Sequence, residues 1–115
     1  MDQQEMKHRT KQFAIDIGYL VISLDKNEIN QPFKNQVIRS SSSVAANYRA
    51  ARRAKSKADF INKLKIVEEE LDESLLFLEL LAEFNLNKSK EIATVYIEGE
   101  VLLKIIVASI TTSRR

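Results

Sequence analysis

The stretch that decides the fold is residues 56–84, which read SKADFINKLKIVEEELDESLLFLELLAEF. It contains no Gly or Pro, and its apolar residues recur at alternating spacings of four and three. This spacing is typical of a helix that packs against its neighbours at a shallow crossing angle. Ser56, followed three residues later by Asp59, forms a variant of the capping box that begins a helix. The predicted core stripe is Phe60, Leu64, Val67, Leu71, Ser74, Leu78 and Leu81.

Three further segments around this stretch show helical periodicity. Asn30 or Gln31 is the predicted cap of the second helix, with Pro32 in its first turn, where a missing N–H costs nothing. Because the connections are short, successive helices should run antiparallel. The predicted fold class is all-α, an antiparallel up-down-up-down four-helix bundle that forms a single domain over residues 1–115. Its helices are predicted at about residues 5–26, 31–54, 56–84 and 88–112.

The composition excludes several kinds of site and activity but does not by itself indicate a function. The chain of 115 residues has no Cys, which excludes disulfides, thiolate zinc sites and a Cys nucleophile. Its only His is His8, so a di-metal carboxylate site with two Glu-x-x-His pairs is not expected, and no serine has a histidine base. We therefore expect no enzyme activity, no metal and no cofactor. The apolar run at 101–110 is about half a membrane span, and we expect a cytoplasmic protein with no membrane partner.

Charge is sorted along residues 39–84 instead of being mixed. Residues 49–65 hold seven bases and one acid, whereas residues 68–83 hold seven acids and no base. This order opposes the macrodipole of the helix that carries it, which prefers acids at its start. A partner is therefore the better reason for the sorting. The basic half is a candidate nucleic-acid-binding surface, because clustered bases neutralise phosphates. Its candidate residues are Arg39, Arg49, Arg52, Arg53, Lys55 and Lys57. A solvated turn, or basic residues that pair with acids of a neighbouring subunit, is the alternative.

The apolar residues outnumber what one buried face per helix can use. On the third helix several of them project opposite the core stripe, on the same side as acidic residues. A monomer would expose this surface as an apolar patch, so we predict a homo-oligomer. The candidate interface residues are Ile66, Glu69, Glu70, Glu73, Phe77, Leu80 and Phe84.

Small residues inside helices predict places where helices approach closely. Gly18 and Gly99 lie near the middles of the first and last helices, where each costs about 1 kcal/mol relative to Ala. Ser43, Ala46 and Ala50 share one face of the second helix. In both cases close packing of another helix is the favoured interpretation, ahead of a ligand site or a catalytic serine.

The segment from Arg39 to Glu73 carries a specific motif. Small residues, Asn-Tyr-Arg, a basic turn, Ser-x-x-Asp-Phe and Glu-Glu-x-Asp-Glu follow one another in that order. In this it resembles the bacterial 23S rRNA-intervening-sequence proteins, or S23-like proteins, whose superfamily includes the accessory variability determinant of diversity-generating retroelements. Helix pattern and length agree over nearly the whole chain. Many members have Asn-x-x-Glu-Gly where this chain has Asn47-Tyr-Arg-Ala50, so it resembles the Asn-Tyr-Arg-Ala subgroup.

The resemblance implies a four-helix bundle that assembles into a ring, typically a homopentamer, with a basic surface for nucleic acid and no enzymatic activity. It also implies structural or interfacial roles for the matching residues Ser43, Asn47, Arg49, Ser56, Phe60, Glu69 and Glu73. Two hypotheses follow. The first is an oligomer that binds RNA or DNA, and the second is a protein-interaction scaffold in which sorted charge sets subunit register or recruits a protein partner.

Overall fold

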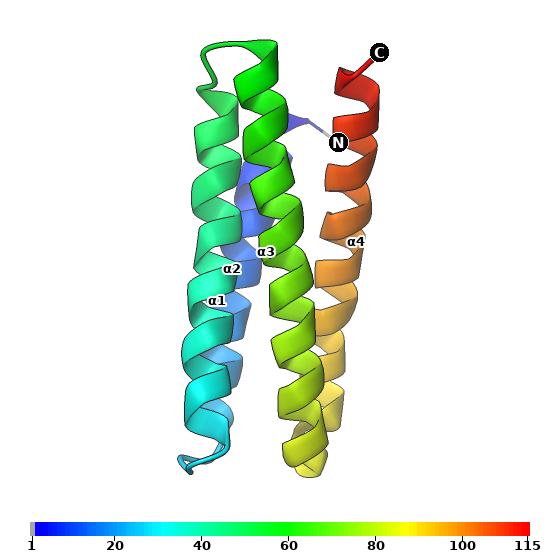
Figure 1. The fold of residues 1–115 in the computed structure, drawn as a ribbon. Coiled ribbons are helices and arrows are strands. Elements are labelled where there is room, and N and C mark those ends of the chain that lie inside the picture. The colour runs from blue at the N-terminus through cyan, green and yellow to red at the C-terminus, as the bar shows by residue number, and fades with distance from the viewer. Residues whose placement is uncertain (1) are drawn as a thin grey trace.

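The chain folds into four long helices that run alternately up and down (Figure 1). The computed structural model describes residues 2–115, and the bundle measures 45 × 21 × 19 Å. Each helix packs against the next in the chain, and α1 also contacts α4. The predicted all-α fold with an up-down bundle is confirmed. The elements are α1 Gln3–Ser23, α2 Asn30–Arg52, α3 Lys57–Phe84, the short 3-10 helix η1 Leu86–Lys88, and α4 Ser89–Ser113.

Side chains near the starts of α2 and α3 accept hydrogen bonds from backbone N–H groups there. Ser56 accepts a hydrogen bond from the Asp59 N–H at 3.0 Å, which confirms Ser56 as the predicted cap. Asp59 accepts its bond of 3.1 Å from the N–H of Lys55, one residue before the cap, instead of from Ser56. The predicted cap of α2, Asn30 or Gln31, is wrong by one or two residues, because the N-cap is Ile29. Asn30 already lies inside the helix, and its N–H donates to the side chain of Asn27 at 2.7 Å.

The first helix also ends earlier than predicted, at Ser23 instead of near residue 26. Leu24 has extended backbone angles, and its side chain is buried. Its carbonyl accepts a hydrogen bond of 2.8 Å from Nζ of Lys34, a lysine only 4% exposed. A positive charge at a helix C-terminus complements the macrodipole, so Lys34 of α2 fixes the end of α1.

The core follows the predicted stripes closely. Every stripe residue of α3 is buried except Phe60, which is half-buried beneath Arg52. One layer of the core is polar: the hydroxyls of Ser40 and Ser74 lie 2.8 Å apart, and Ser74 donates a further bond to the Glu70 carbonyl at 2.9 Å. Both serines are fully buried, so their hydroxyls need these partners.

The two glycines differ, and only one confirms the prediction. A Cβ on Gly99 would lie 2.9 Å from Cδ2 of Leu75 and 3.2 Å from the ring of Phe13, so α4 does approach its neighbours closely there. A Cβ on Gly18 would meet nothing within 4 Å. The prediction of close packing within the chain is therefore wrong for Gly18, because that position faces away from the bundle. Among residues 2–115, no helix is both long and apolar enough to cross a membrane.

Candidate nucleic-acid interface

A basic groove lies at the end of the bundle where α2 turns into α3. The capping box of Ser56 and Asp59 shapes the turn, and α1 begins at the same end (Figure 1). The groove has a volume of about 880 Å³. It is lined by Lys7, Ala46, Arg49, Ala50, Arg52, Arg53, Lys55, Ser56, Asp59 and Lys63. Six basic side chains from three helices and one turn thus surround a single depression.

The charge of this basic groove is largely uncompensated. Asp59 is its only acidic residue, and its carboxylate accepts a hydrogen bond from the Lys55 backbone N–H. Within residues 2–115, none of the six basic side chains of the groove takes part in a salt bridge. Like charges held this close together attract an anion and concentrate it at the groove.

Arg52 is held in place by aromatic residues. Its guanidinium carbon lies 5.4 Å from the centre of the Phe60 ring, a cation–π geometry. Its Nε is buried and has no hydrogen-bond partner among the described residues. Burial raises the pKa of Tyr48, an effect that the nearby Arg52 guanidinium partly opposes. Arg52 is therefore packed against the protein, whereas Arg49, Arg53 and Lys55 are exposed.

The structure brings together four of the six basic residues that the sequence singled out. Arg49, Arg52, Arg53 and Lys55 all line the basic groove. Lys57 does not line it, and its Nζ instead donates to the carbonyl of Arg115 at 3.4 Å. The binding role of these residues stays a prediction.

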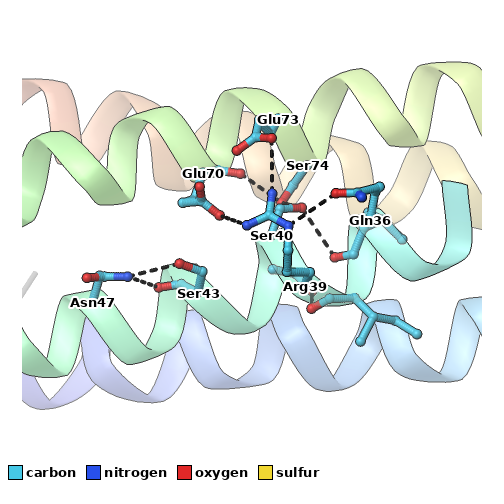
Figure 2. A network of polar contacts seen from close by, with 11 residues as sticks. Gln36, Arg39, Ser40, Ser43, Asn47, Glu70, Glu73 and Ser74 are labelled. Carbon is cyan, nitrogen blue, oxygen red and sulfur yellow. Dashed lines mark hydrogen bonds and ion pairs between the residues drawn. The ribbon is translucent and has the colours of Figure 1, made fainter. Parts of the chain in front are cut away.

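Arg39 lies elsewhere, over the middle of α3 (Figure 2). Its guanidinium contacts Glu70 at 2.9 Å and Glu73 at 3.0 Å, and its Nε donates to Gln36 at 3.1 Å. The grouping of Arg39 with the basic turn is therefore wrong, because its charge is already matched by two acids of the same chain. Burial raises the pKa of Glu70, and the adjacent Glu73 raises it further, while Arg39 acts in the opposite direction.

Sequence reasoning missed two lysines of the basic groove, Lys7 and Lys63. Lys63 is one of the bases in the sorted stretch, two turns into the predicted third helix. Lys7 lies in α1, far away in sequence. An up-down topology places the start of the first helix beside the turn between the second and third, so the predicted fold carried the signal for Lys7.

The candidate subunit interface on α3 is partly covered by the chain itself. Phe33 of α2 stacks on Phe84 at 6.2 Å between ring centres and contacts Phe77 at 6.4 Å. Phe77 and Leu80 are half-buried, so the expectation that they lie on an exposed face is wrong. Ile66 and Phe84 do remain exposed, at 37% and 53%.

The acids on this side of α3 are also partly engaged within the chain and partly exposed. Glu70 and Glu73 pair with Arg39, and Glu69 is exposed. Contact of Ile66, Glu69, Glu70, Glu73, Phe77, Leu80 and Phe84 with another subunit stays a prediction. Within residues 2–115 there is no group of three or more His, Asp or Glu side chains that could hold a metal ion.

The fold and the groove define a small all-α protein, a four-helix bundle with a cationic depression at one end. The chain belongs to the 23S rRNA-intervening sequence protein family, whose profile matches residues 2–108. It is similar to the crystal structure of a protein with unknown function from the S23 ribosomal protein family of Bacteroides thetaiotaomicron. The two are 30% identical with a TM-score of 0.87, over 96% of this chain and 99% of that chain. No curated protein matches this sequence.

Proposed function

We propose that this chain is a non-enzymatic homo-oligomer that binds the phosphate backbone of RNA or DNA in the basic groove. One observation carries the proposal: six basic side chains without salt bridges surround one open depression that holds a single acid. Phosphates are bound in this way by nucleic-acid-binding proteins, with little dependence on base sequence. A ring, with five copies as the family resemblance implies, would repeat the groove and multiply weak contacts into a useful affinity.

The division of the groove into fixed and mobile cations supports this function. Arg52 is held against Phe60, so it loses little conformational freedom when it meets a phosphate. Arg53 and Lys55 are exposed and adjust to the path of a flexible strand. The cap of α3 further fixes the turn that carries them.

The test is fluorescence anisotropy with a labelled 20-nucleotide RNA and its DNA counterpart, over a series of salt concentrations. We expect log K to fall linearly with log salt, by about 0.7 per phosphate neutralised on a single strand and about 0.9 on duplex DNA. Replacing Arg53, Lys55 and Lys63 by Glu should reduce binding at least tenfold. The control replaces Lys26, Lys65 and Lys90, which give the same charge change outside the groove.

Equal loss in both triple variants would show that only net charge matters, and would contradict the groove as the site. Binding that survives the groove variant would contradict it as well.

The alternative is a protein-interaction scaffold, which the exposed apolar side chains Ile22 and Ile97 favour, at 80% and 59% exposure. It predicts no retention of nucleic acid at physiological salt. The two functions are thus separated by the same anisotropy measurement, together with the mass of the protein by light scattering with and without RNA.

A further inference from the structure

The outer side of α1 carries an apolar stripe that the bundle does not use. Tyr19 is 71% exposed and Ile22 is 80% exposed, and Ile15 lies one turn before Tyr19 at 38%. The positions follow helical spacings of four and three, so they form one line along the helix. Gly18 lies on the same side. We call Ile15, Gly18, Tyr19 and Ile22 the α1 stripe.

Beside the α1 stripe, α2 presents small side chains. A shallow groove of about 640 Å³ separates the two helices on this outer side. It is lined by Lys11, Ala14, Ile15, Ser42, Ala45, Ala46 and Arg49. The face of Ser43, Ala46 and Ala50 was predicted to admit another helix. Ser43 and Ala50 are half-buried, whereas Ala46 and the nearby Ser42 are exposed.

Gly18 is a second, independent indication that a helix from another molecule packs closely against this side of α1. Glycine is among the poorest helix formers, and a side chain at the half-buried Gly18 would meet nothing within 4 Å in the same chain. Small residues on a helix surface allow another helix to come close, as small-residue motifs do between membrane helices. Ala14 of α1 and Ser42, Ala45 and Ala46 of α2 therefore line a recess between larger side chains, and Gly18 lies one turn beyond Ala14. We call this surface the α1–α2 recess.

A second apolar stripe lies on the outer side of α4. Ile97 is 59% exposed and Val101 is 38% exposed, and Ala108 continues the line two turns further on. We call these residues the α4 stripe. Its large branched side chains project outward, whereas the α1–α2 recess is hollow. Glu100 is exposed next to Val101 and, within residues 2–115, forms no side-chain hydrogen bond or ion pair.

We propose that the α4 stripe of a second copy of this chain occupies the α1–α2 recess. This rests on the oligomer of the proposed function and names its contact surfaces. Three features favour this occupant. Ile97 and Val101 are large exposed side chains, whereas small side chains line much of the recess, and both stripes have the spacing for shallow helix crossing. Charge also matches, because Lys11 at the edge of the recess would meet Glu100.

The pairing joins two unlike surfaces, so it is heterologous. Every copy then has one recess and one stripe to offer, and repetition closes into a ring when the rotation allows. A symmetric pairing of two α1 stripes would leave both α4 stripes exposed and would stop at a dimer. The heterologous contact covers both apolar surfaces of each copy inside a ring.

Light scattering coupled to size exclusion tests the pairing with three double variants. The recess variant carries Ile15→Glu and Ser42→Glu, both at residues that line the recess, and the stripe variant carries Ile97→Glu and Val101→Glu. The control carries Leu76→Glu and Leu86→Glu, which lie outside both surfaces and are 50% and 76% exposed. We expect the first two variants to be monomers and the control to keep the wild-type mass. Circular dichroism verifies that each variant keeps its helices.

Mixing gives the decisive result. The recess variant still has an intact stripe, and the stripe variant still has an intact recess, so an equimolar mixture should form a 1:1 dimer. A mixture that stays monomeric would overturn the pairing, as would a stripe variant that still forms a dimer by itself. A wild-type monomer would overturn the oligomer of the proposed function as well. Variants that keep the wild-type mass overturn only this choice of surfaces.

Discussion

At the residue scale, Gly18 and Gly99 show that the same residue type occupies two different environments. The backbone of Gly99 lies against Leu75 and Phe13, and a side chain there would press on the core. Gly18 has open space beyond it. Both positions look alike in the sequence, because each is a glycine inside a long helix, and only the direction in which the position faces separates them.

Alanine substitutions should therefore have opposite effects. In the monomeric background of Ile97→Glu and Val101→Glu, Gly18→Ala should raise the free energy of unfolding by about 0.5–1 kcal/mol, since it improves helix propensity without a clash. Gly99→Ala should lower it by about 1 kcal/mol, because overpacking against Phe13 outweighs the same gain. Urea unfolding followed by circular dichroism gives both values. Equal effects of the two substitutions would contradict this assignment.

Glu70 gives the network on Arg39 a pH dependence. Its side chain is 14% exposed, and burial together with Glu73 raises its pKa above the ordinary 4.5. The folded chain therefore holds this proton more tightly than the unfolded chain does. Ionisation of Glu70 is less favourable in the folded chain than in the unfolded chain. The free energy of unfolding therefore falls as the pH rises from about 4.5 upward.

Glu70→Gln should remove this loss. Relative to wild type, the variant should become more stable as the pH is raised from about 4 to about 7, since Gln does not titrate there. Urea unfolding at the two pH values measures the change. Glu69→Gln, an exposed neighbour outside the network, is the control and should show no such trend. A difference between Glu70→Gln and wild type that is constant with pH would contradict the assigned pKa direction.

At the element scale, a buried amide pair joins two helices at one end of the bundle, opposite the turn between α2 and α3. Asn30, at the start of α2, and Asn85, at the end of α3, exchange hydrogen bonds of 2.9 and 2.7 Å. Each also donates to a backbone carbonyl, Asn30 to Asp25 and Asn85 to Leu81. The pair therefore connects the turn after α1 with the turn before α4.

Replacing either asparagine by Ala should lower the free energy of unfolding by about 1–3 kcal/mol, because the remaining amide stays buried without its partner. Since both single changes remove the same bonds, the double variant should cost at least 0.5 kcal/mol less than the sum of the two, which is about the smallest coupling seen for contacting residues. Urea unfolding of the four proteins measures the coupling. Asn62→Ala, at an exposed position, is the control, and strict additivity would contradict the pair.

The elements also show what periodicity can and cannot predict. The stripe of α3 was predictable because a 4/3 spacing fixes one face of a helix. The burial of Phe77 was not, because α3 packs against both α2 and α4, so its covered arc is wider than a single stripe. Arg39 illustrates the same limit. One residue turns a helix by 100°, so small differences in helix rotation decide whether a base meets an acid or solvent.

At the scale of the whole molecule, four helices, their order and the position of the basic groove all follow from the sequence pattern. The residues that complete the groove do not, since Lys7 joins it only through the packing of α1 beside the turn. Short-range signals placed the cap of α3 correctly. The end of α1 depends on Lys34, ten residues away from Leu24 in the next helix, and no local motif announces it.

An even number of antiparallel helices returns the chain to the end where it started. Residue 2 and residue 115 both lie at the end of the bundle that carries the basic groove (Figure 1), and Lys57 of α3 contacts the carbonyl of Arg115. Any tag or reporter fused to either terminus would emerge beside the groove and bring its own charge to it. A polyhistidine or acidic tag would therefore distort a binding measurement. Labels are better attached at Leu86–Lys88, at the opposite end of the 45 Å bundle.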